Sequence, residues 1–303
     1  MAVLIDPPRW PAHGTWFSHL VSDTSLAELH AFAAAAGVPL RAFDHDHYDV
    51  SEQRYAHLVS QGAVEVSERE LLLRLRASGL RVRPAQRTPS AAKVVPALRA
   101  AWRRLLPGEP GLGEELLERW SEPHRRYHDV RHLAQALAAA EHLAAGEPPR
   151  QVLLALWFHD AVYDLKPGQD EELSARLAVN HLARAELPAA EADEVARLVR
   201  LTARHVLDAG DDPDGALVLD ADLSILGQIP GRYDVYVRDV RLEYGTVPDA
   251  DFTRGRIAVI DGLLGLDPLF STEAGRDAWE AAARQNLTAE RRRWTEGDSV
   301  SGA

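Results

Sequence analysis

The sequence predicts a two-domain α+β chain, in which a small α/β domain over residues 1–85 precedes an all-α domain over residues 92–303. Two patterns support this division. Short apolar runs alternate with helical patterns as far as Arg83, whereas helical patterns alone follow from Lys93 onward. The stretch between them, "RPAQRTPSAAK", is rich in proline and polar residues and has no apolar period, which is typical of a linker.

The N-terminal domain is expected to alternate strands and helices. "VLID", "VPLRAF" and "AVEV" are expected to be short strands. Three helices are expected over residues 25–37, 51–62 and 67–79, each opened by a serine and ended near a glycine. The polar segment "DHDHYD" follows the second strand. Its His45, His47 and Tyr48, with His19, could form a ligand patch, but we expect a polar loop there.

The C-terminal domain is expected to contain helices and no strand. These helices cover residues 93–106, 114–121, 128–145, 150–163, 171–185, 190–207, 216–227, 230–244, 251–265 and 274–292.

Composition limits the chemistry. The chain has no cysteine, which excludes disulfides, thiolate catalysis and cysteine-ligated metals, so any metal must bind to nitrogen and oxygen. A net charge of −12 argues against duplex nucleic acid as a partner and favours a small-molecule substrate. The longest apolar runs are too short to span a bilayer, so we expect a soluble cytoplasmic protein with no membrane partner. The oligomeric state stays open.

Acidic and imidazole side chains fall on predicted buried faces. Asp222 shares one helical face with Leu219, Leu223 and Leu226, and a buried carboxylate needs a cation, a proton or several donors. An ion pair with an arginine is at least as good an explanation of Asp222 alone. The apolar run of residues 152–158 leads directly into His159 and Asp160, which favours a ligand cluster at that helix end.

Two further helices carry inward-facing histidines. His128 and His132 are four residues apart and are expected on one helical face. The stripe that contains Val195 and Val199 continues to His205. Any one of these features is weak by itself, but four helices that direct histidine or aspartate to one interior indicate a shared site.

The order of His132, the doublet His159–Asp160 and Asp222 resembles the HD superfamily of metal-dependent phosphohydrolases, which is named after that doublet. The segments "EPHRRYHDVRHL", "LALWFHDAVYD", "DEELSA", "LTARH", "LDADLSILG", "EYGTV", "FTRGR" and "ARQNL" look like a bacterial branch of predicted metal-dependent phosphohydrolases, over roughly residues 92–294. The resemblance implies an HD-type helical fold in which His132, His159, Asp160 and Asp222 bind a divalent metal. Mn, Fe, Co, Ni, Zn and Mg all suit nitrogen and oxygen ligands.

Other roles follow from the same resemblance. Tyr163 stands where other HD branches have a glutamate, so Asp164 and Glu171 are the catalytic candidates for orienting the attacking water or moving its proton. Candidates for a second metal or for phosphate binding are His128, His205, Arg126 and Arg204. In "WFSHLVSDTSLAELHAFA", "HYDV" and "GAVEVSERELL" the N-terminal domain is similar to DUF4031, a small bacterial family of unknown function.

The resulting hypothesis is hydrolysis of a phosphate ester or phosphoanhydride in a nucleotide-like small molecule by metal-activated water. Two alternatives remain. The chain could be a non-catalytic sensor that binds a nucleotide or metal, or, if His128 and His205 complete a two-iron site, an HD-fold di-iron oxygenase. Metal content and oxygen-dependent turnover distinguish the oxygenase, and turnover of any phosphorylated compound distinguishes the enzyme from the sensor.

Overall fold

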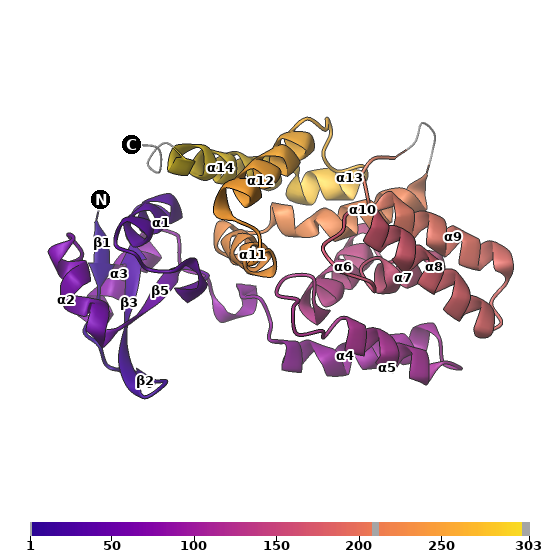
Figure 1. The fold of residues 1–303 in the computed structure, drawn as a ribbon, viewed down its shortest axis with the longest axis horizontal. Coiled ribbons are helices and arrows are strands. Elements are labelled where there is room, and N and C mark those ends of the chain that lie inside the picture. The colour runs from indigo at the N-terminus through magenta and orange to yellow at the C-terminus, as the bar shows by residue number, and fades with distance from the viewer. Residues whose placement is uncertain (1, 208–211, 299–303) are drawn as a thin grey trace. The chain divides into compact units, whose positions relative to one another are not determined.

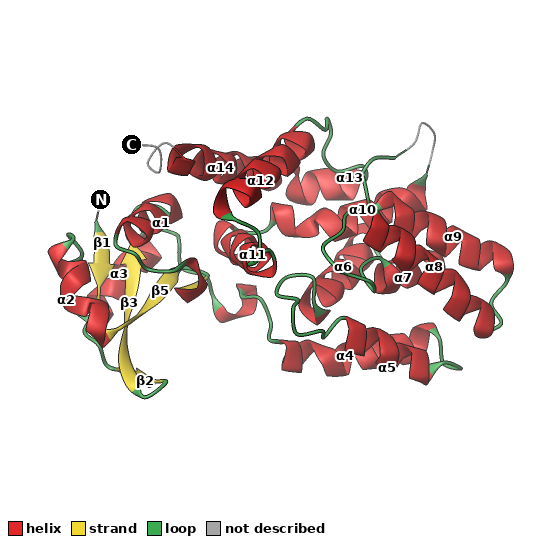
Figure 2. Cartoon of the chain, in the orientation of Figure 1, coloured by secondary structure: helices red, strands yellow, loops and turns green. Residues whose placement is uncertain are grey.

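The computed structural model describes residues 2–207 and 212–298 (Figures 1 and 2). Contacts between Cα atoms divide the chain into two compact units. The first unit contains Met1–Arg87, Ile229–Leu242 and Arg292–Ala303, and the second contains Thr88–Gln228 and Glu243–Arg291. We call them the N-terminal unit and the helical unit. Among the described residues, no helix is both long and apolar enough to cross a membrane.

The N-terminal unit is built on a small mixed sheet (Figure 2). Its strands are β1 (Val3–Ile5), β2 (Trp10–Ala12), β3 (Thr15–Ser22), β4 (Phe43–Asp44), β5 (His47–Ser51) and β6 (Val64–Glu65). The strand order is β4-β5-β3-β1-β6, with β2 paired to β3. β6 runs parallel to β1, and the other pairs are antiparallel.

The helices of this unit begin as the sequence predicts. They are α1 (Leu26–Ala35), α2 (Glu52–Ser60) and α3 (Glu68–Ala77). Ser25 and Ser67 each accept a backbone N–H from the residue three positions on, as an N-cap does. Ile5, Leu20 and Leu29 form part of the buried core, and Val235 of α11 (Pro230–Glu243) packs into the same cluster.

Three expectations for this unit were wrong. β2 and β3 were not foreseen, because Ser18 and Ser22 occupy buried positions of β3 where apolar residues would have marked a strand. "VPLRAF" forms a short 3-10 turn, Leu40–Ala42, before β4. The polar segment expected to be a loop contains β5, which pairs with β3.

Among its described residues, the second unit contains helices joined by turns and loops and no strand, as expected. Its elements are α4 (Ala91–Leu105), α5 (Pro110–Arg119), α6 (Val130–Leu143), α7 (Arg150–Phe158), α8 (Gln169–Arg184), α9 (Ala189–Leu201), α10 (Pro213–Asp222), a 3-10 turn (Leu223–Gly227), α12 (Asp249–Leu264), α13 (Glu273–Gly275), a π-helical turn (Arg276–Glu280) and α14 (Ala281–Asp298), which ends in the N-terminal unit.

Helix α7 lies at the centre of the helical unit. It contacts α4, α6, α8, α9 and α10. Leu154, Trp157 and Phe158 are almost fully buried, as expected for a helix that is apolar on every side. Two neighbouring indoles, Trp102 and Trp120, are also buried, and the Trp120 Nε1–H donates to the backbone carbonyl of Trp157 at 3.0 Å. This packing fixes the C-terminal end of α7.

Candidate metal centre

The four sequence-predicted metal ligands meet at the C-terminal end of α7. His159 is the residue that ends this helix, Asp160 follows it, His132 comes from α6 and Asp222 from the end of α10. The Nε2 atom of His132 lies 3.1 Å from Nε2 of His159 and 3.0 Å from Oδ1 of Asp222. The Nε2 atom of His159 lies 3.3 Å from Oδ2 of Asp160 and 3.5 Å from Oδ1 of Asp222.

These separations fit a bound ion. Two ligand atoms that each bind one transition metal at its usual bond length lie about 3.0–3.5 Å apart. Nδ1 of His159 faces the backbone carbonyl oxygen of Leu156 at 2.9 Å and donates to it, which leaves the Nε2 lone pair for the centre. A side-chain oxygen of Asp160 lies with the two imidazole nitrogens in a group whose atoms are all within 4.8 Å of one another. The donor set is therefore that of a hard or borderline divalent metal.

The electrostatics favour positive charge at this point. Burial would lower the pKa of His159, but Asp160 and Asp222 raise it well above its ordinary value. Burial would raise the pKa of Asp222, but His159 and His132 lower it well below its ordinary value. Burial lowers the pKa of His132 and keeps that imidazole neutral. The two carboxylates thus favour a cation beside the imidazoles, and a metal ion can supply that charge.

His205 reaches the centre by a different route from the one expected. We predicted that it continues helix α9, but α9 ends at Leu201 and His205 lies in the following turn with φ of 50°. Its Nε2 lies 2.8 Å from Oδ2 of Asp222, so Asp222 contacts His205 through one oxygen and the two ligand histidines through the other.

His128 lies beside the centre, just before α6 and not on it, which corrects the expectation of one shared helical face. Its ring is 5.6 Å from that of His132, between centroids. Its Nδ1 is 2.7 Å from Oε2 of Glu243, and Oε1 of Glu243 accepts the backbone N–H groups of residues 126–128, each at 2.8 Å. Burial would lower the pKa of His128, but Glu243 and the nearby aspartates raise it.

Glu243 was not identified from the sequence as a site residue. Its carboxylate is almost fully buried and also accepts the Tyr163 hydroxyl at 3.1 Å. Burial would raise the pKa of Glu243, but His128 and the backbone donors lower it to about 2. The available signal was helical spacing, since Tyr233, Val240 and Glu243 fall on one face of α11.

Arg125 is a second residue that sequence reasoning missed. Its side chain is fully buried and donates to the backbone carbonyls of His128 at 2.9 Å and Asp160 at 2.8 Å. The guanidinium also lies over the rings of Trp120 and Tyr163, at 5.4 and 5.2 Å. Arg125 therefore connects the segment before α6 to the segment after α7.

The remaining candidates are not brought to the four ligands. Asp164 is mostly exposed and lies 3.8 Å from the Lys166 ammonium. Glu171 accepts the backbone N–H of Gly168 at the start of α8, as a capping residue does. Arg126 and Arg204 are exposed, and Nη1 of Arg126 donates to the backbone carbonyl of Pro123 at 2.7 Å.

Asp220, which lies close to Asp222 in sequence, has a structural role. Its carboxylate accepts the backbone N–H groups of Ser271 and Thr272, both at 2.7 Å, and the Thr272 hydroxyl at 2.6 Å. Asp220 therefore binds the segment before α13 and not the four ligand candidates.

Three of the four residues of the N-terminal patch considered from the sequence lie on strands and not in a loop. His19 is on β3, and His47 and Tyr48 are on β5. Tyr48 is buried, and its hydroxyl lies 2.7 Å from Nδ1 of His30, so it is part of the core. His45 is buried in the β4–β5 turn beside Asp44. Of the patch considered from the sequence, the structure thus brings together His19 and His47.

Comparison with known proteins gives a result for the N-terminal unit alone. No curated protein and no solved structure matches the chain. Residues 3–78 match the family described as protein of unknown function (DUF4031), so the N-terminal part of this chain is a DUF4031 domain.

Proposed function

We propose that the helical unit is a metal-dependent phosphohydrolase of the HD type, which hydrolyses a phosphate ester or phosphoanhydride of a nucleotide-like small molecule. The observation that carries this proposal is the convergence of His132, His159, Asp160 and Asp222 at the end of α7. Four acceptor-rich side chains from three separate helices meet within ligand distance in a largely apolar interior, where burying charge costs free energy. Metal binding explains that arrangement better than four unrelated ion pairs.

A divalent ion held there would lower the pKa of a bound water and stabilise negative charge on a phosphoryl oxygen. The side chains of Asp160 and Asp222 are 14% and 13% exposed, so the ligand set is open on the side of these carboxylates. The partly exposed His205 contacts Asp222 on that side, and the partly exposed His128 lies beside His132.

His128 is the best-placed group for proton transfer or for binding a phosphate oxygen. Glu243 binds its Nδ1 and favours its cationic form, which leaves Nε2–H to donate. The catalytic roles that the resemblance implies for Asp164 and Glu171 stay predictions. The described contacts of these two side chains are with Lys166 and Gly168 and not with the four ligand candidates.

A second metal is favoured by one observation. The Oδ2 atom of Asp222 is free of the first ligand set and contacts His205 at 2.8 Å, so this carboxylate could bridge two ions. Two equivalents of iron with oxygen-dependent turnover would establish the oxygenase alternative, and binding of a nucleotide without turnover would establish the sensor.

The test is metal content together with phosphate release. Full-length protein, His159→Ala and Asp222→Ala are purified without chelator, analysed for metals and incubated with a panel of nucleotides and sugar phosphates. His142→Ala is the control, because His142 is exposed in the last turn of α6. We expect each ligand variant to lose the metal equivalent of this centre and phosphate release, and the control to keep both. A wild-type chain that takes up metal and yet hydrolyses no compound would overturn the catalytic proposal.

A further inference from the structure

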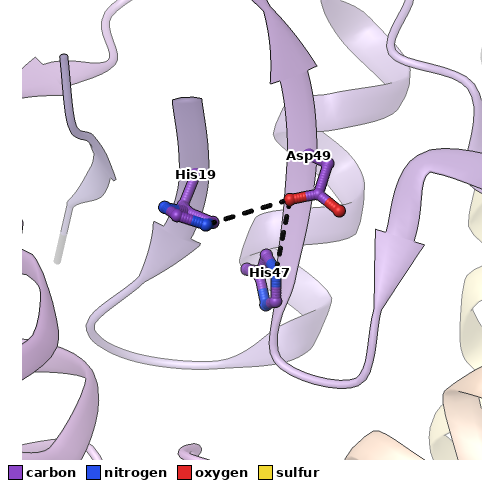
Figure 3. A group of neighbouring side chains, drawn as sticks. All are labelled: His19, His47 and Asp49. Carbon is purple, nitrogen blue, oxygen red and sulfur yellow. Dashed lines mark ion pairs between the residues drawn. The ribbon is translucent and has the colours of Figure 1, made fainter. Parts of the chain in front are cut away.

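A second group of metal-ligating side chains lies on the sheet of the N-terminal unit. His19 of β3 is directly opposite Asp49 of β5, and His47 precedes Asp49 by two residues. Because side chains alternate along a strand, all three share one face of the sheet. Figure 3 shows the two imidazoles directed at the same carboxylate oxygen.

Both imidazoles are oriented by buried carboxylates. Nδ1 of His19 lies 2.8 Å from Oδ2 of Asp6, and Nδ1 of His47 lies 2.7 Å from Oδ1 of Asp46. Asp6 and Asp46 are at most 2% exposed, and Asp46 also accepts the backbone N–H of Val82 at 2.7 Å. A carboxylate behind an imidazole fixes the ring and its tautomer, as it does in many metal sites.

This tautomer creates an unfavourable arrangement unless a cation is present. An ionised carboxylate only accepts, so each Nδ1 must donate, and the neutral ring then carries its lone pair on Nε2. Those two Nε2 atoms lie 4.0 Å (His19) and 3.4 Å (His47) from Oδ1 of Asp49, and the three atoms lie within 4.8 Å of one another. When both rings are neutral, these three acceptors repel one another, and a metal ion or a proton on an imidazole removes that repulsion.

We propose that the N-terminal unit binds a divalent transition metal, such as zinc or cobalt, through Nε2 of His19, Nε2 of His47 and the carboxylate of Asp49. Two imidazoles and one carboxylate leave coordination positions open for water or an oxygen ligand. Asp49 is 49% exposed and His19 is 27% exposed, so an ion can enter from solvent and Asp49 can rotate to complete the contacts. The described contacts of these residues are all within the N-terminal unit, so the proposal does not depend on the function of the helical unit.

The competing occupant is a proton. Two imidazolium rings around Asp49 would form a hydrogen-bonded network of the same shape with no metal. The experiment must therefore measure the ion directly.

The test uses the full-length chain with His159→Ala and Asp222→Ala, which removes two ligands of the other centre. The protein is stripped with chelator, dialysed against micromolar Zn²⁺ and analysed for metal. About one zinc per chain is expected to remain. Adding Asp49→Ala or His47→Ala should remove it, whereas adding His57→Ala, an exposed histidine of α2, should not. Zinc absent from the starting variant, or unchanged by Asp49→Ala, would overturn the proposal.

The fluorescence of Trp10 gives an independent test of where the metal ion binds. Its indole is 49% exposed and its ring lies 5.3 Å from that of His19. Co²⁺ quenches nearby indole fluorescence, so titration of the same starting variant should quench emission, and Trp10→Phe should remove most of this quenching. Trp16→Phe is the control, because Trp16 is similarly exposed on β3. Equal quenching with and without Trp10 would place the ion elsewhere.

Discussion

The two histidine clusters of this chain are positioned in different ways. In the helical unit the ligand candidates come from residues 132, 159–160 and 222, and tertiary packing of helices brings them together. In the N-terminal unit they come from two neighbouring strands, and strand register alone places His19 opposite Asp49. A backbone carbonyl orients His159, whereas buried carboxylates orient His19 and His47. The helical cluster should therefore depend on distant packing, and the sheet cluster on its local partners.

The largest expected effect is a loss of stability that is confined to the helical unit. Arg125→Ala removes a buried guanidinium that binds two backbone carbonyls, so the free energy of unfolding of the helical unit should fall by about 3 kcal/mol. Metal should also be lost from the helical cluster and kept by the sheet cluster. Urea denaturation and elemental analysis measure these changes.

The neighbouring Arg126→Ala is the matched control, because Arg126 is exposed. Its free energy of unfolding should change by less than about 0.5 kcal/mol. Equal losses in the two arginine variants would contradict the packing argument.

A smaller effect is expected from Glu243→Gln. The amide keeps the size of the side chain but removes the charge that favours the cationic form of His128. Phosphate release should fall about 10- to 100-fold, because such supporting partners typically contribute that much, while metal content stays unchanged. Steady-state kinetics on the best substrate of the panel measures it. A larger loss in Glu171→Gln or Asp164→Asn would instead favour the catalytic residues predicted from the sequence.

The corresponding change in the sheet cluster is Asp6→Asn. The Asp6 carboxylate binds both the ring and the backbone N–H of His19, so its loss should weaken zinc binding about 10-fold. Competition with a chromogenic chelator measures the affinity. Glu65→Gln on β6 is the control, since Glu65 contacts Tyr55 and not the histidines. Equal affinity in Asp6→Asn and the control would show that the carboxylate does not orient a ligand.

The smallest effect concerns acid stability of the N-terminal unit. The Arg74 guanidinium lowers the pKa of Asp23 from 3.8 to about 2. Because the folded-state pKa is below the unfolded one, the pair stabilises the fold above about pH 4, and this contribution is lost as the pH falls toward 2. Asp23→Asn should cost about 1 kcal/mol at pH 7 and much less at pH 2, in thermal unfolding at both pH values. A pH-independent cost would indicate that packing, and not charge, is responsible.

The helices could be predicted from the sequence because their signals are local. Ser25 and Ser67 act as caps where expected, and the apolar run of α7 is buried as expected. The structure brings together His132, His159, Asp160 and Asp222, and their role as metal ligands stays a prediction. His205 also contacts Asp222, although by a turn instead of a longer helix.

The strands were harder to predict because several of the side chains buried on or beside them are polar. His47 and Asp49 follow one another at the spacing of a strand, yet their segment has the composition of a loop. Asp46, just before this strand, accepts hydrogen bonds from Arg81 and Val82, which are distant in sequence. The role of Glu243 was missed for the same reason, because its partners at residues 126–128 are more than 110 positions away.

The assignment of residues 229–242 and 292–303 to the N-terminal unit bears on how this protein can be divided for experiments. A fragment ending at Arg87 would contain the whole matched DUF4031 segment, residues 3–78. It would nevertheless lack Val235 from its core and Asp234, which lies 3.0 Å from Nε2 of the buried His30. The segment that matches the family is thus shorter than the set of residues that pack into the N-terminal unit. Protein fragments that end at the family boundary should therefore be poorly soluble.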